Sequence, residues 1–351
     1  MKDTKETLIY ILKRLGLMVL TFIIIFILCF CLVRLLPNTA QAAPGQDPEM
    51  FFKSQVAMGR MYQDANGDYH DLPIISQLGV FIKNLFVPNT YTTSTGEVLT
   101  VSPFGYSYKI DYLATPIEVM LDRLPPTVLI NVYSSLLSVP IGLGIGIYMA
   151  LKKNQWQDHL LSILIMLFIS VPSFVYAFLV QYLLGFNGPF EPEVIKLPTF
   201  EGNWGWFDPG VTFSMILPVL AMSFGSIASY ARYTRAELTE VLTSDFMLLA
   251  RTKGLTRQEA TVRHALRNSM VPIFPMLLGQ IISVLSGSLV IEKIFNIPGV
   301  GGVFLQSITS RDLDVFQFVS MFYVLIGLVG GLVVDVSYGI VDPRIRMGGE
   351  K

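Results

Sequence analysis

Several windows of about 20 residues in this chain hold almost no charged side chain, and they constrain its fold more than any other feature. A helix needs about 20 apolar residues to cross the hydrocarbon core of a bilayer. Hydrophobic residues make up 52% of the 351 residues and charged residues only 15%, whereas soluble domains carry about 25% charged residues. Because backbone polar groups in lipid must be paired within the protein, the sequence predicts an all-α polytopic membrane protein.

Six spans are predicted, so both termini are expected on one side of the membrane. Their approximate bounds are 15–33, 127–151, 160–184, 213–233, 270–290 and 315–340. Short loops rich in Lys and Arg mark the cytoplasmic side. The side that holds the termini carries 16 of the 25 basic residues, namely Lys2, Lys5, Lys13, Arg14, Lys152, Lys153, Arg232, Arg235, Arg251, Lys253, Arg257, Arg263, Arg267, Arg344, Arg346 and Lys351. We therefore expect both termini in the cytoplasm.

The first span has a competing interpretation as a signal peptide. Lys13 and Arg14 precede an apolar run, and the small residues at 39–43 are typical of a cleavage site. The apolar run of about 19 residues is longer than the 7–15 of a signal core, which favours a retained span. Cleavage would leave five spans and move the N-terminus outside.

The segment 37–123 is predicted to form an extracellular α+β insert between the first two spans. Asn66–Gly67 and Thr95–Gly96 stand at turn positions between short β-like runs and predict two hairpins. Acidic and amide residues at 64–68 resemble the start of a calcium loop. However, Tyr69 stands where that loop requires Gly, and Ile75 where it requires Glu, so a polar hairpin tip is favoured.

The cysteines and histidines do not predict a disulfide or a metal site. Cys29 and Cys31 both lie in the first span, and residues two apart on a helix do not share a face. His70, His159 and His264 are scattered along the chain.

The cytoplasmic loop 234–272 shows a pattern of two short helices. The first covers 245–253 and ends at Gly254, which suits the left-handed conformation that ends a helix. Thr256 and Glu259 then form the sequence of a capping box, in which each side chain pairs with the other's backbone amide. We expect Asn268 to end the second helix.

This basic, amphipathic segment is interpreted as a docking surface for a cytoplasmic partner, with Pro272 opening the fifth span. The competing interpretation is that its basic side chains only anchor the loop to anionic lipid headgroups. Anchoring alone does not explain the glycine turn followed by the capping box.

The same residues resemble a known family. Residues 250–255 (Ala-Arg-Thr-Lys-Gly-Leu), 263–268 (Arg-His-Ala-Leu-Arg-Asn) and Pro272 look like the "EAA" coupling loop of binding-protein-dependent ABC importer permeases, in its oligopeptide and dipeptide form. The run Glu-Lys-Ile-Phe-Asn-Ile-Pro-Gly-Val-Gly at 292–301 resembles the B-type membrane subunit. Further similar segments are Arg-Leu-Pro-Pro-Thr at 123–127, Ser-Val-Pro-Ser-Phe at 170–174 and Asp-Pro-Arg-Ile-Arg at 342–346.

The resemblance covers roughly 117–346, with two departures. The acidic residue that opens the general pattern is missing, and Ala250 is the clearest match to its alanines. The 18 residues from Gly254 to Pro272 also exceed the general spacing. Both departures weaken the assignment of residues at the start of the loop.

The resemblance implies the six-helix fold of type I ABC importer permeases, with a coupling helix at 256–268 that lies in a cleft of an ATPase subunit. Leu255, Val262 and Leu266 would supply burial there. The residues implied for docking are Ala250, Lys253, Gly254, Leu255, Glu259, Val262, Arg263, His264 and Arg267. Implied partners are a second homologous permease, two cytoplasmic ATPases, an extracellular solute-binding protein and a peptide substrate, in a lipid membrane and without nucleic acid. ATP and magnesium would bind the ATPases, so no cofactor, metal or catalytic residue is assigned to this chain.

Polar residues at helical spacing suggest a translocation path. Such stripes line a wet path or allow helices to pack closely, and the sequence leaves both open. The candidate path residues are Asn131, Ser134, Ser138, Ser226, Gln280 and Ser283. The loop 292–311 is expected to fold back as an external gate, with Glu292, Pro298, Gly299 and Gly301 as its candidate residues.

Asp335 is the one acidic residue inside a predicted span. An intramembrane charge is a functional candidate by default. The favoured interpretation is an ion pair with the Arg344 region or with a neighbouring span.

The sequence thus predicts a peptide importer permease with four parts: 1–36, 37–123, 124–341 and the tail 342–351. It holds no Gly-x4-Gly-Lys-[Ser/Thr] phosphate loop, so ATP hydrolysis is expected from partners. Import of nickel or another small solute is an alternative. A self-sufficient secondary transporter is a further one, but it would predict inverted repeats, broken spans and charged midplane sites, and the sequence shows none of these.

Overall fold

The structure is a computed structural model that describes residues 2–36, 48–92, 96–188 and 209–341. The chain forms two compact units. The first comprises 1–16, 125–301 and 326–351, and the second comprises 17–124 and 302–325. The small-residue run at 39–43 and the tail 342–351, including Arg344, lie outside the described residues.

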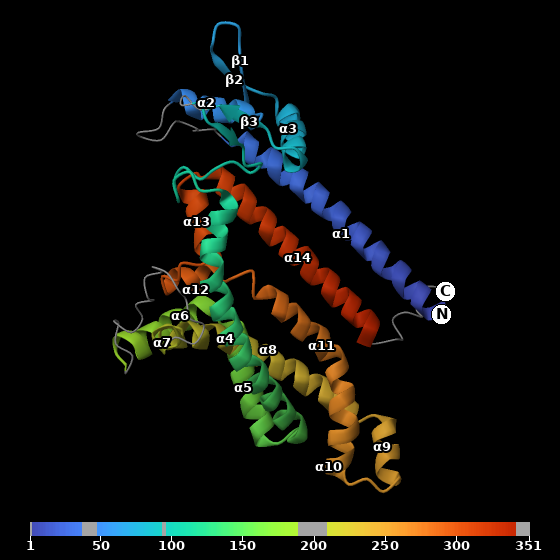
Figure 1. Ribbon diagram of the computed structural model, residues 1–351. Coiled ribbons are helices and arrows are strands. Elements are labelled where there is room, and N and C mark those ends of the chain that lie inside the picture. Colours follow the sequence, from blue (N-terminus) through green and yellow to red (C-terminus); the bar gives the residue numbers. More distant parts are fainter. Residues whose placement is uncertain (1, 37–47, 93–95, 189–208, 342–351) are drawn as a thin grey trace. The chain divides into compact units, whose positions relative to one another are not determined.

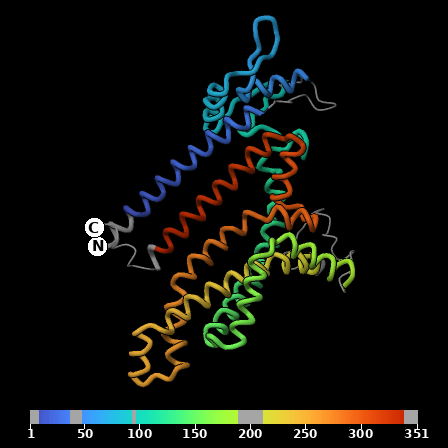
Figure 2. Tube along the Cα trace, turned by 180° about the vertical axis from the view of Figure 1, so that it is seen from behind, coloured from blue at the N-terminus to red at the C-terminus, as the bar shows by residue number. Residues whose placement is uncertain are grey.

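The first unit is helical and is organised around α8 (Ile216–Leu242). Helices α5 (Trp156–Ser170), α6 (Ser173–Val180) and α11 (Leu266–Ser283) all contact α8, and Figures 1 and 2 show α8 and α11 side by side. Its core includes Ile130, Ala177, Met215, Leu217 and Ile291, all almost fully buried. The remaining elements are α4 (Pro116–Leu151) from Pro125 onward, a π-helical turn (Gln181–Phe186), α7 (Pro209–Ser214), α9 (Asp245–Thr252), α10 (Arg257–Ala260), a second π-helical turn (Thr261–Ala265) and α12 (Leu289–Ile294). The start of α1 (Lys2–Leu35) and the end of α14 (Leu313–Val341) also belong to this unit.

The second unit combines helices with two small hairpins, as predicted for the insert. Strand β1 (Met61–Gln63) pairs antiparallel with β2 (Tyr69–Asp71), and β3 (Thr90–Thr92) with β4 (Val98–Thr100). The registers Tyr62↔His70 and Tyr91↔Leu99 confirm both hairpin predictions. The helices of this unit are α1 from Leu17 onward, α2 (Pro48–Ala57), α3 (Ile74–Phe86), α4 up to Leu124, α13 (Val300–Thr309) from Gly302 onward and α14 up to Leu325.

The first hairpin turn is closed by Asp64. Its Oδ1 accepts hydrogen bonds from the backbone amides of Asn66, at 2.8 Å, and Asp68, at 2.9 Å. These bonds and the partner His70 Nε2, 3.2 Å from Asp64 Oδ2, hold the pKa of Asp64 below its usual value. No three His, Cys, Asp or Glu side chains within the described ranges gather as a metal site would require. The turn therefore needs no ion to explain the Asp64 carboxylate.

Four helices among the described residues are long and apolar enough to cross a membrane: Ile9–Leu35, Pro116–Leu151, Arg257–Ser283 and Leu313–Tyr338. A bent pair, Trp156–Ser170 with Ser173–Phe186, would make a fifth. Helix α8 covers the predicted fourth span, but its serines, tyrosines and Arg232 dilute its apolar character. The count of six spans therefore stays a prediction.

The third span is not the continuous helix that was predicted over 160–184, and the expectation of unbroken spans is wrong here. The chain bends by 99° between α5 and the helix that starts at Ser173. Pro172 has no amide hydrogen and disfavours helical geometry at Val171, which is extended (φ −85°, ψ 128°). The Tyr176 hydroxyl donates to the Phe168 carbonyl at 2.6 Å and so satisfies a group that the break exposes.

The start of the fifth span also differs from the prediction. Asn268 does not end a helix, and Pro272 does not begin one, because α11 runs from Leu266 to Ser283 with Pro272 and Pro275 inside it. The carbonyl of His264, four residues before Asn268, instead accepts from the Asn268 side chain at 2.9 Å. The coupling segment and the fifth span are therefore one nearly continuous helix.

Asp335 pairs with a neighbouring span, which was one of its two predicted partners. Arg14 Nη1 of α1 lies 3.1 Å from Asp335 Oδ2 of α14, and both side chains are partly exposed. This pair gives the intramembrane carboxylate a structural explanation.

Candidate functional site

The predicted docking segment forms a hairpin of α9 and α10 at one end of the first unit (Figure 1). Gly254 turns the chain between these helices with φ +94°, a conformation that side chains other than glycine rarely adopt. Its amide donates to the Arg251 carbonyl at 3.0 Å, and the Leu255 amide reaches the Ala250 carbonyl at 3.4 Å. The glycine predicted to end the first helix therefore sets the angle between the two helices.

The predicted capping box is present at the start of α10. The Thr256 hydroxyl accepts from the Glu259 amide at 3.2 Å, and the Thr256 amide donates to Glu259 Oε2 at 3.0 Å. The same hydroxyl donates to Glu259 Oε2 at 2.8 Å. These bonds satisfy amides that a helix start leaves without partners, and they fix where α10 begins.

The inner face of the hairpin packs against the rest of its unit. Ala250 is buried, and Leu255 and Leu266 pack against the same hydrophobic cluster. The buried members of that cluster are Ala150, Leu238, Met247, Ala250, Ala260 and Ala265. Of the three apolar residues expected to supply burial to a partner, Val262 alone is exposed, at 59%. Ala250, Leu255 and Leu266 instead anchor the hairpin to α4 and α8.

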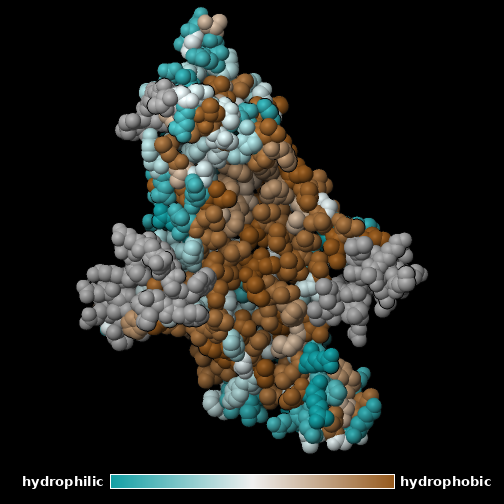
Figure 3. Space-filling view, viewed as in Figure 1, coloured by the Kyte–Doolittle hydropathy of each residue, from teal (hydrophilic) through white to brown (hydrophobic). Residues whose placement is uncertain are grey.

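The outer face presents basic residues around one apolar side chain. The π-helical turn Thr261–Ala265 buries both of its end residues and leaves Val262, Arg263 and His264 exposed in succession. A π-helical turn contains one residue more than an α-helical turn, and such turns are frequent at functional sites. Lys253, Glu259 and Arg267 are exposed as well. Figure 3 shows a largely hydrophilic surface over α9 and α10, in contrast to the hydrophobic surface over α11.

Three exposed apolar residues of α9 were missed by the sequence analysis. Phe246, Leu248 and Leu249 are 42%, 64% and 55% exposed, whereas Met247 between them is buried. The run Phe-Met-Leu-Leu at 246–249 was the available signal, because a short helix cannot bury four consecutive large residues against one neighbour. These residues enlarge the apolar surface of the hairpin.

An ion pair between a buried aspartate and a partly exposed arginine, not identified from the sequence, holds α5 against α8. Asp158 is completely buried, and its carboxylate accepts from Arg235 at 2.5 and 2.8 Å and from the Asn154 amide at 2.9 Å. Arg235 lies two turns before the end of α8, just ahead of the α9–α10 hairpin. The pair therefore braces the helix that carries the hairpin.

The predicted gate residues surround a buried carboxylate. Glu292 in α12 is completely buried, and Thr127 Oγ1 of α4 donates to its Oε1 at 2.9 Å. The same Thr127 oxygen accepts from the Val300 amide at 2.9 Å. A Cβ atom added to Gly299 would lie 2.5 Å from Thr127 Oγ1, and one added to Gly301 would lie 2.9 Å from Glu292 Oε2. Glycine is therefore required sterically at both positions.

The geometry of the loop 292–301 follows from these contacts. The Ile297 amide donates to the Glu292 backbone carbonyl at 2.8 Å, and the partly buried Pro298 follows. The loop is fixed to α4 at Thr127, within the first unit.

The predicted path residues mostly pair with other helices or with their own backbone. Ser134 Oγ lies 3.2 Å from Ser223 Oγ, and the Asn131 side-chain Nδ2 donates to the Thr127 carbonyl at 2.7 Å. Gln280 donates to Ser135 Oγ at 3.3 Å. Ser138 is buried, Ser226 is partly buried, and the exposed Ser283 donates to the Gln280 carbonyl. The contacts between helices favour the packing interpretation for Ser134 and Gln280, whereas Asn131 bonds within its own helix.

A cavity of about 240 Å³ lies elsewhere in the first unit. None of the six predicted path residues lines it. Its lining residues come from α8, α11 and α14 and are Tyr233, Glu237, Pro272, Ile273, Met276 and Tyr338. The cavity therefore adjoins the helix that continues from the hairpin.

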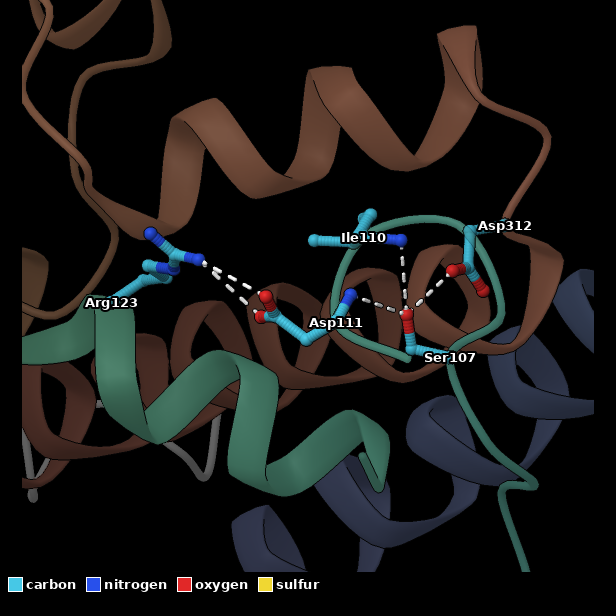
Figure 4. Close-up of polar contacts among 5 residues, drawn as sticks. All are labelled: Ser107, Ile110, Asp111, Arg123 and Asp312. Atoms are coloured by element: carbon cyan, nitrogen blue, oxygen red, sulfur yellow. Dashed lines mark hydrogen bonds and ion pairs between the residues drawn. The ribbon is translucent and has the colours of Figure 1, made fainter. Parts of the chain in front are cut away.

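In the second unit, two carboxylates before and within α14 organise the loop 102–115. Ser107 donates to Asp312 Oδ2 at 2.7 Å, and its oxygen accepts from the amides of Ile110 and Asp111 (Figure 4). Arg60 pairs with Asp314 at 2.6 and 2.9 Å, and both side chains are almost fully buried.

The two buried carboxylates differ in the groups that surround them. Asp314 is paired with Arg60, whereas burial raises the pKa of Asp312, which accepts hydrogen bonds from the Ser107 hydroxyl and the Lys109 amide. This network could not be predicted from local sequence patterns, because its partners lie more than 200 residues apart.

The fold defines a helical, multi-pass membrane protein, and comparison with known proteins gives its family. Residues 142–347 match the family described as "Binding-protein-dependent transport system inner membrane component". The chain is 34% identical over 339 residues to the dipeptide transport system permease protein DppB of Lactococcus lactis subsp. cremoris, covering 96% of this chain and 99% of that protein. It is 30% identical to the DppB protein of Bacillus subtilis and 30% identical to the glutathione transport system permease protein GsiC of Salmonella typhimurium, each covering 96% of this chain and 98% of the relative.

The chain therefore belongs to the family of binding-protein-dependent transport system inner membrane components, and it is a multi-pass protein of the cell membrane. The resemblance drawn from the coupling loop and the 292–301 run is confirmed by these comparisons.

Proposed function

We propose that this chain is a permease subunit of an ATP-driven importer of short peptides, and that it is coupled to partner ATPases through the α9–α10 hairpin. The full transporter would contain a second homologous permease, two ATPases that bind ATP and magnesium, and an extracellular solute-binding protein. Two curated relatives are named dipeptide permeases, which supports a peptide substrate. A further relative is named a glutathione permease, which supports a substrate of similar size and chemistry.

The observation that carries the coupling role is the construction of the hairpin. Its inner face is fixed by a buried cluster, its turn by Gly254 and its second helix by the capping box of Thr256 and Glu259. This rigid base presents Val262, Arg263 and His264 outward. Because α10 continues through the π-helical turn into α11, a force on the outer face would be transmitted along the predicted fifth span.

The coupling role is tested by charge reversal at the capping box. Glu259→Lys removes the acceptor of the Thr256 amide, whereas Glu259→Gln keeps a capping side chain and is the matched control. Uptake of a labelled dipeptide is expected to fall at least tenfold in the Lys variant and to stay near normal in the Gln variant, at equal membrane amounts. Normal uptake by Glu259→Lys and by Gly254→Asp would contradict the proposal.

The substrate class is tested separately by competition. An excess of unlabelled dipeptides is expected to block uptake of the labelled dipeptide, while nickel salts leave it unchanged. Block by nickel would support the alternative in which this family member imports a metal complex.

A further inference from the structure

Helix α3 of the insert buries polar side chains and exposes apolar ones, which is the reverse of an ordinary surface helix. Its buried face carries Gln77, Phe81 and Asn84, which are spaced four and three residues apart. Gln77 donates to the Leu72 carbonyl at 2.7 Å, and Asn84 to the Ala57 carbonyl at 3.5 Å. Polar amides thus face inward.

The outward face of α3 is apolar. Ile75, Ile82 and Phe86 are 85%, 43% and 81% exposed, and with Gly79 they follow the spacing of one helical stripe. Leu85 and Val87 extend this surface, at 42% and 63% exposed. A contiguous exposed apolar surface marks a contact with protein or membrane.

The level of α3 relative to the membrane follows from its contacts with α1, which belongs to the same unit from Leu17 onward. The Phe81 ring lies 5.5 Å from the Phe26 ring and 5.3 Å from the Phe30 ring. The membrane-spanning part of α1 covers Ile9–Leu35, 27 residues, of which about 20 occupy the hydrocarbon core. Every stretch of about 20 residues within that range includes Phe26. Phe81 therefore lies at the edge of the hydrocarbon or inside it.

The outward side of α1 at this level is itself exposed and apolar. Ile23, Ile24, Ile27 and Leu28 are between 37% and 57% exposed. The apolar stripe of α3 thus lies beside a surface made for lipid. Lys83 borders the stripe and donates to Asn89 Oδ1 at 3.2 Å. A lysine beside an apolar stripe suits the headgroup level, where its stem is buried and its ammonium is hydrated.

We propose that α3 is an interfacial helix whose stripe Ile75–Gly79–Ile82–Phe86 is immersed in the outer boundary of the bilayer, so that lipid covers it. The insert would then be held at a fixed height on the membrane by α3 as well as by α1. A lipid environment is favoured over a protein partner because the stripe contains neither charged nor hydrogen-bonding side chains, whereas protein interfaces are enriched in Arg, Tyr and Trp.

Site-directed spin labelling tests this placement. Single cysteines are introduced at Ile75, Ile82 or Phe86 in a full chain that carries Cys29→Ala and Cys31→Ala. The chain is reconstituted, with the subunits that copurify with it, into phosphatidylcholine–phosphatidylglycerol vesicles. Ser76→Cys and Lys83→Cys, one stripe away on the same helix, are the matched controls. Collision rates are then measured with oxygen, which concentrates in lipid, and with a water-soluble nickel chelate.

A severalfold higher oxygen-to-nickel ratio at the three stripe positions than at Ser76 and Lys83 is expected. Equal ratios at stripe and control positions would place α3 in water and overturn the proposal. Labels at the stripe that are immobile and inaccessible to both reagents would show that protein covers it, which would also overturn the proposal. Because the labels replace exposed side chains, folding should be retained, and a changed elution volume in detergent identifies any variant that fails to fold. For such a variant, a tryptophan is introduced at the same position in place of the spin label. Quenching of its fluorescence by brominated lipid then reports contact with lipid.

Discussion

Thr127 joins two elements of the first unit through one hydroxyl, so replacing it by valine gives a sharp test of the gate geometry. Valine has nearly the same shape as threonine but has no hydroxyl. Thr127→Val would delete the donor to Glu292 Oε1 and the acceptor of the Val300 amide, both at 2.9 Å. Thr127→Ser keeps the hydroxyl and is the control.

The expected cost follows from the burial of all three groups. A hydrogen bond to a charged group contributes about 1.5–3 kcal/mol, and a buried donor left unsatisfied costs about 1–3 kcal/mol. The two costs sum to about 2.5–6 kcal/mol, and we expect about 3 kcal/mol because Glu292 has a further partner. At about 2–4 °C per kcal/mol for a unit of this size, the unfolding temperature should fall by about 6–12 °C.

Thermal unfolding in detergent, followed by fluorescence-detected size-exclusion chromatography, measures this shift. Thr127→Ser should lose much less, because only a methyl group is removed. A Thr127→Val protein that unfolds within about 1 °C of the unsubstituted protein would refute the account of this contact, and so would an equal loss in both variants.

Three further predictions concern other parts of the chain. Gly254→Ala should cost about 1–2 kcal/mol, because φ +94° is strained for alanine, and should lower peptide uptake more than Gly254→Asn does. Arg235→Gln leaves the buried Asp158 carboxylate unpaired and should destabilise the protein by about 3–5 kcal/mol, whereas the double variant with Asp158→Asn should recover much of the unfolding temperature. Because burial raises the pKa of Asp312, the folded state binds a proton that the unfolded chain releases as the pH rises above the ordinary aspartate value. Resistance of the insert to proteolysis should therefore fall as the pH rises through the raised pKa, and Asp312→Asn should remove this dependence; an unchanged profile in that variant would contradict the assignment.

Local signals in the sequence were sufficient for the features that depend on neighbouring residues. The hairpin turn at Asn66–Gly67, the pairing of β3 with β4, the turn at Gly254 and the capping box at Thr256 all form as predicted. Each depends on backbone conformation or hydrogen bonds within a few residues.

Features that depend on tertiary contacts were not predictable in this way. Pro172 breaks its helix, whereas Pro272 lies inside one, so the residue type alone does not decide where a helix ends. The contacts that decide the gate and the insert, Thr127 with Glu292 and Arg60 with Asp314, join residues 165 and 254 positions apart. Only the folded chain shows that Ala250 and Leu255 pack inward while Phe246 and Val262 stay exposed.

The central claim is that the outer face of the hairpin contacts an ATPase, and photo-cross-linking at Val262 tests it most directly. A photoreactive amino acid at this exposed position is activated in native membranes, and adducts are identified by mass spectrometry, with Ile82 of α3 as the control position. The account predicts a Val262 adduct with a protein that contains a phosphate-loop motif and no such adduct at Ile82. Lipid adducts alone at Val262, in membranes where the ATPases copurify with this chain, would contradict the coupling role.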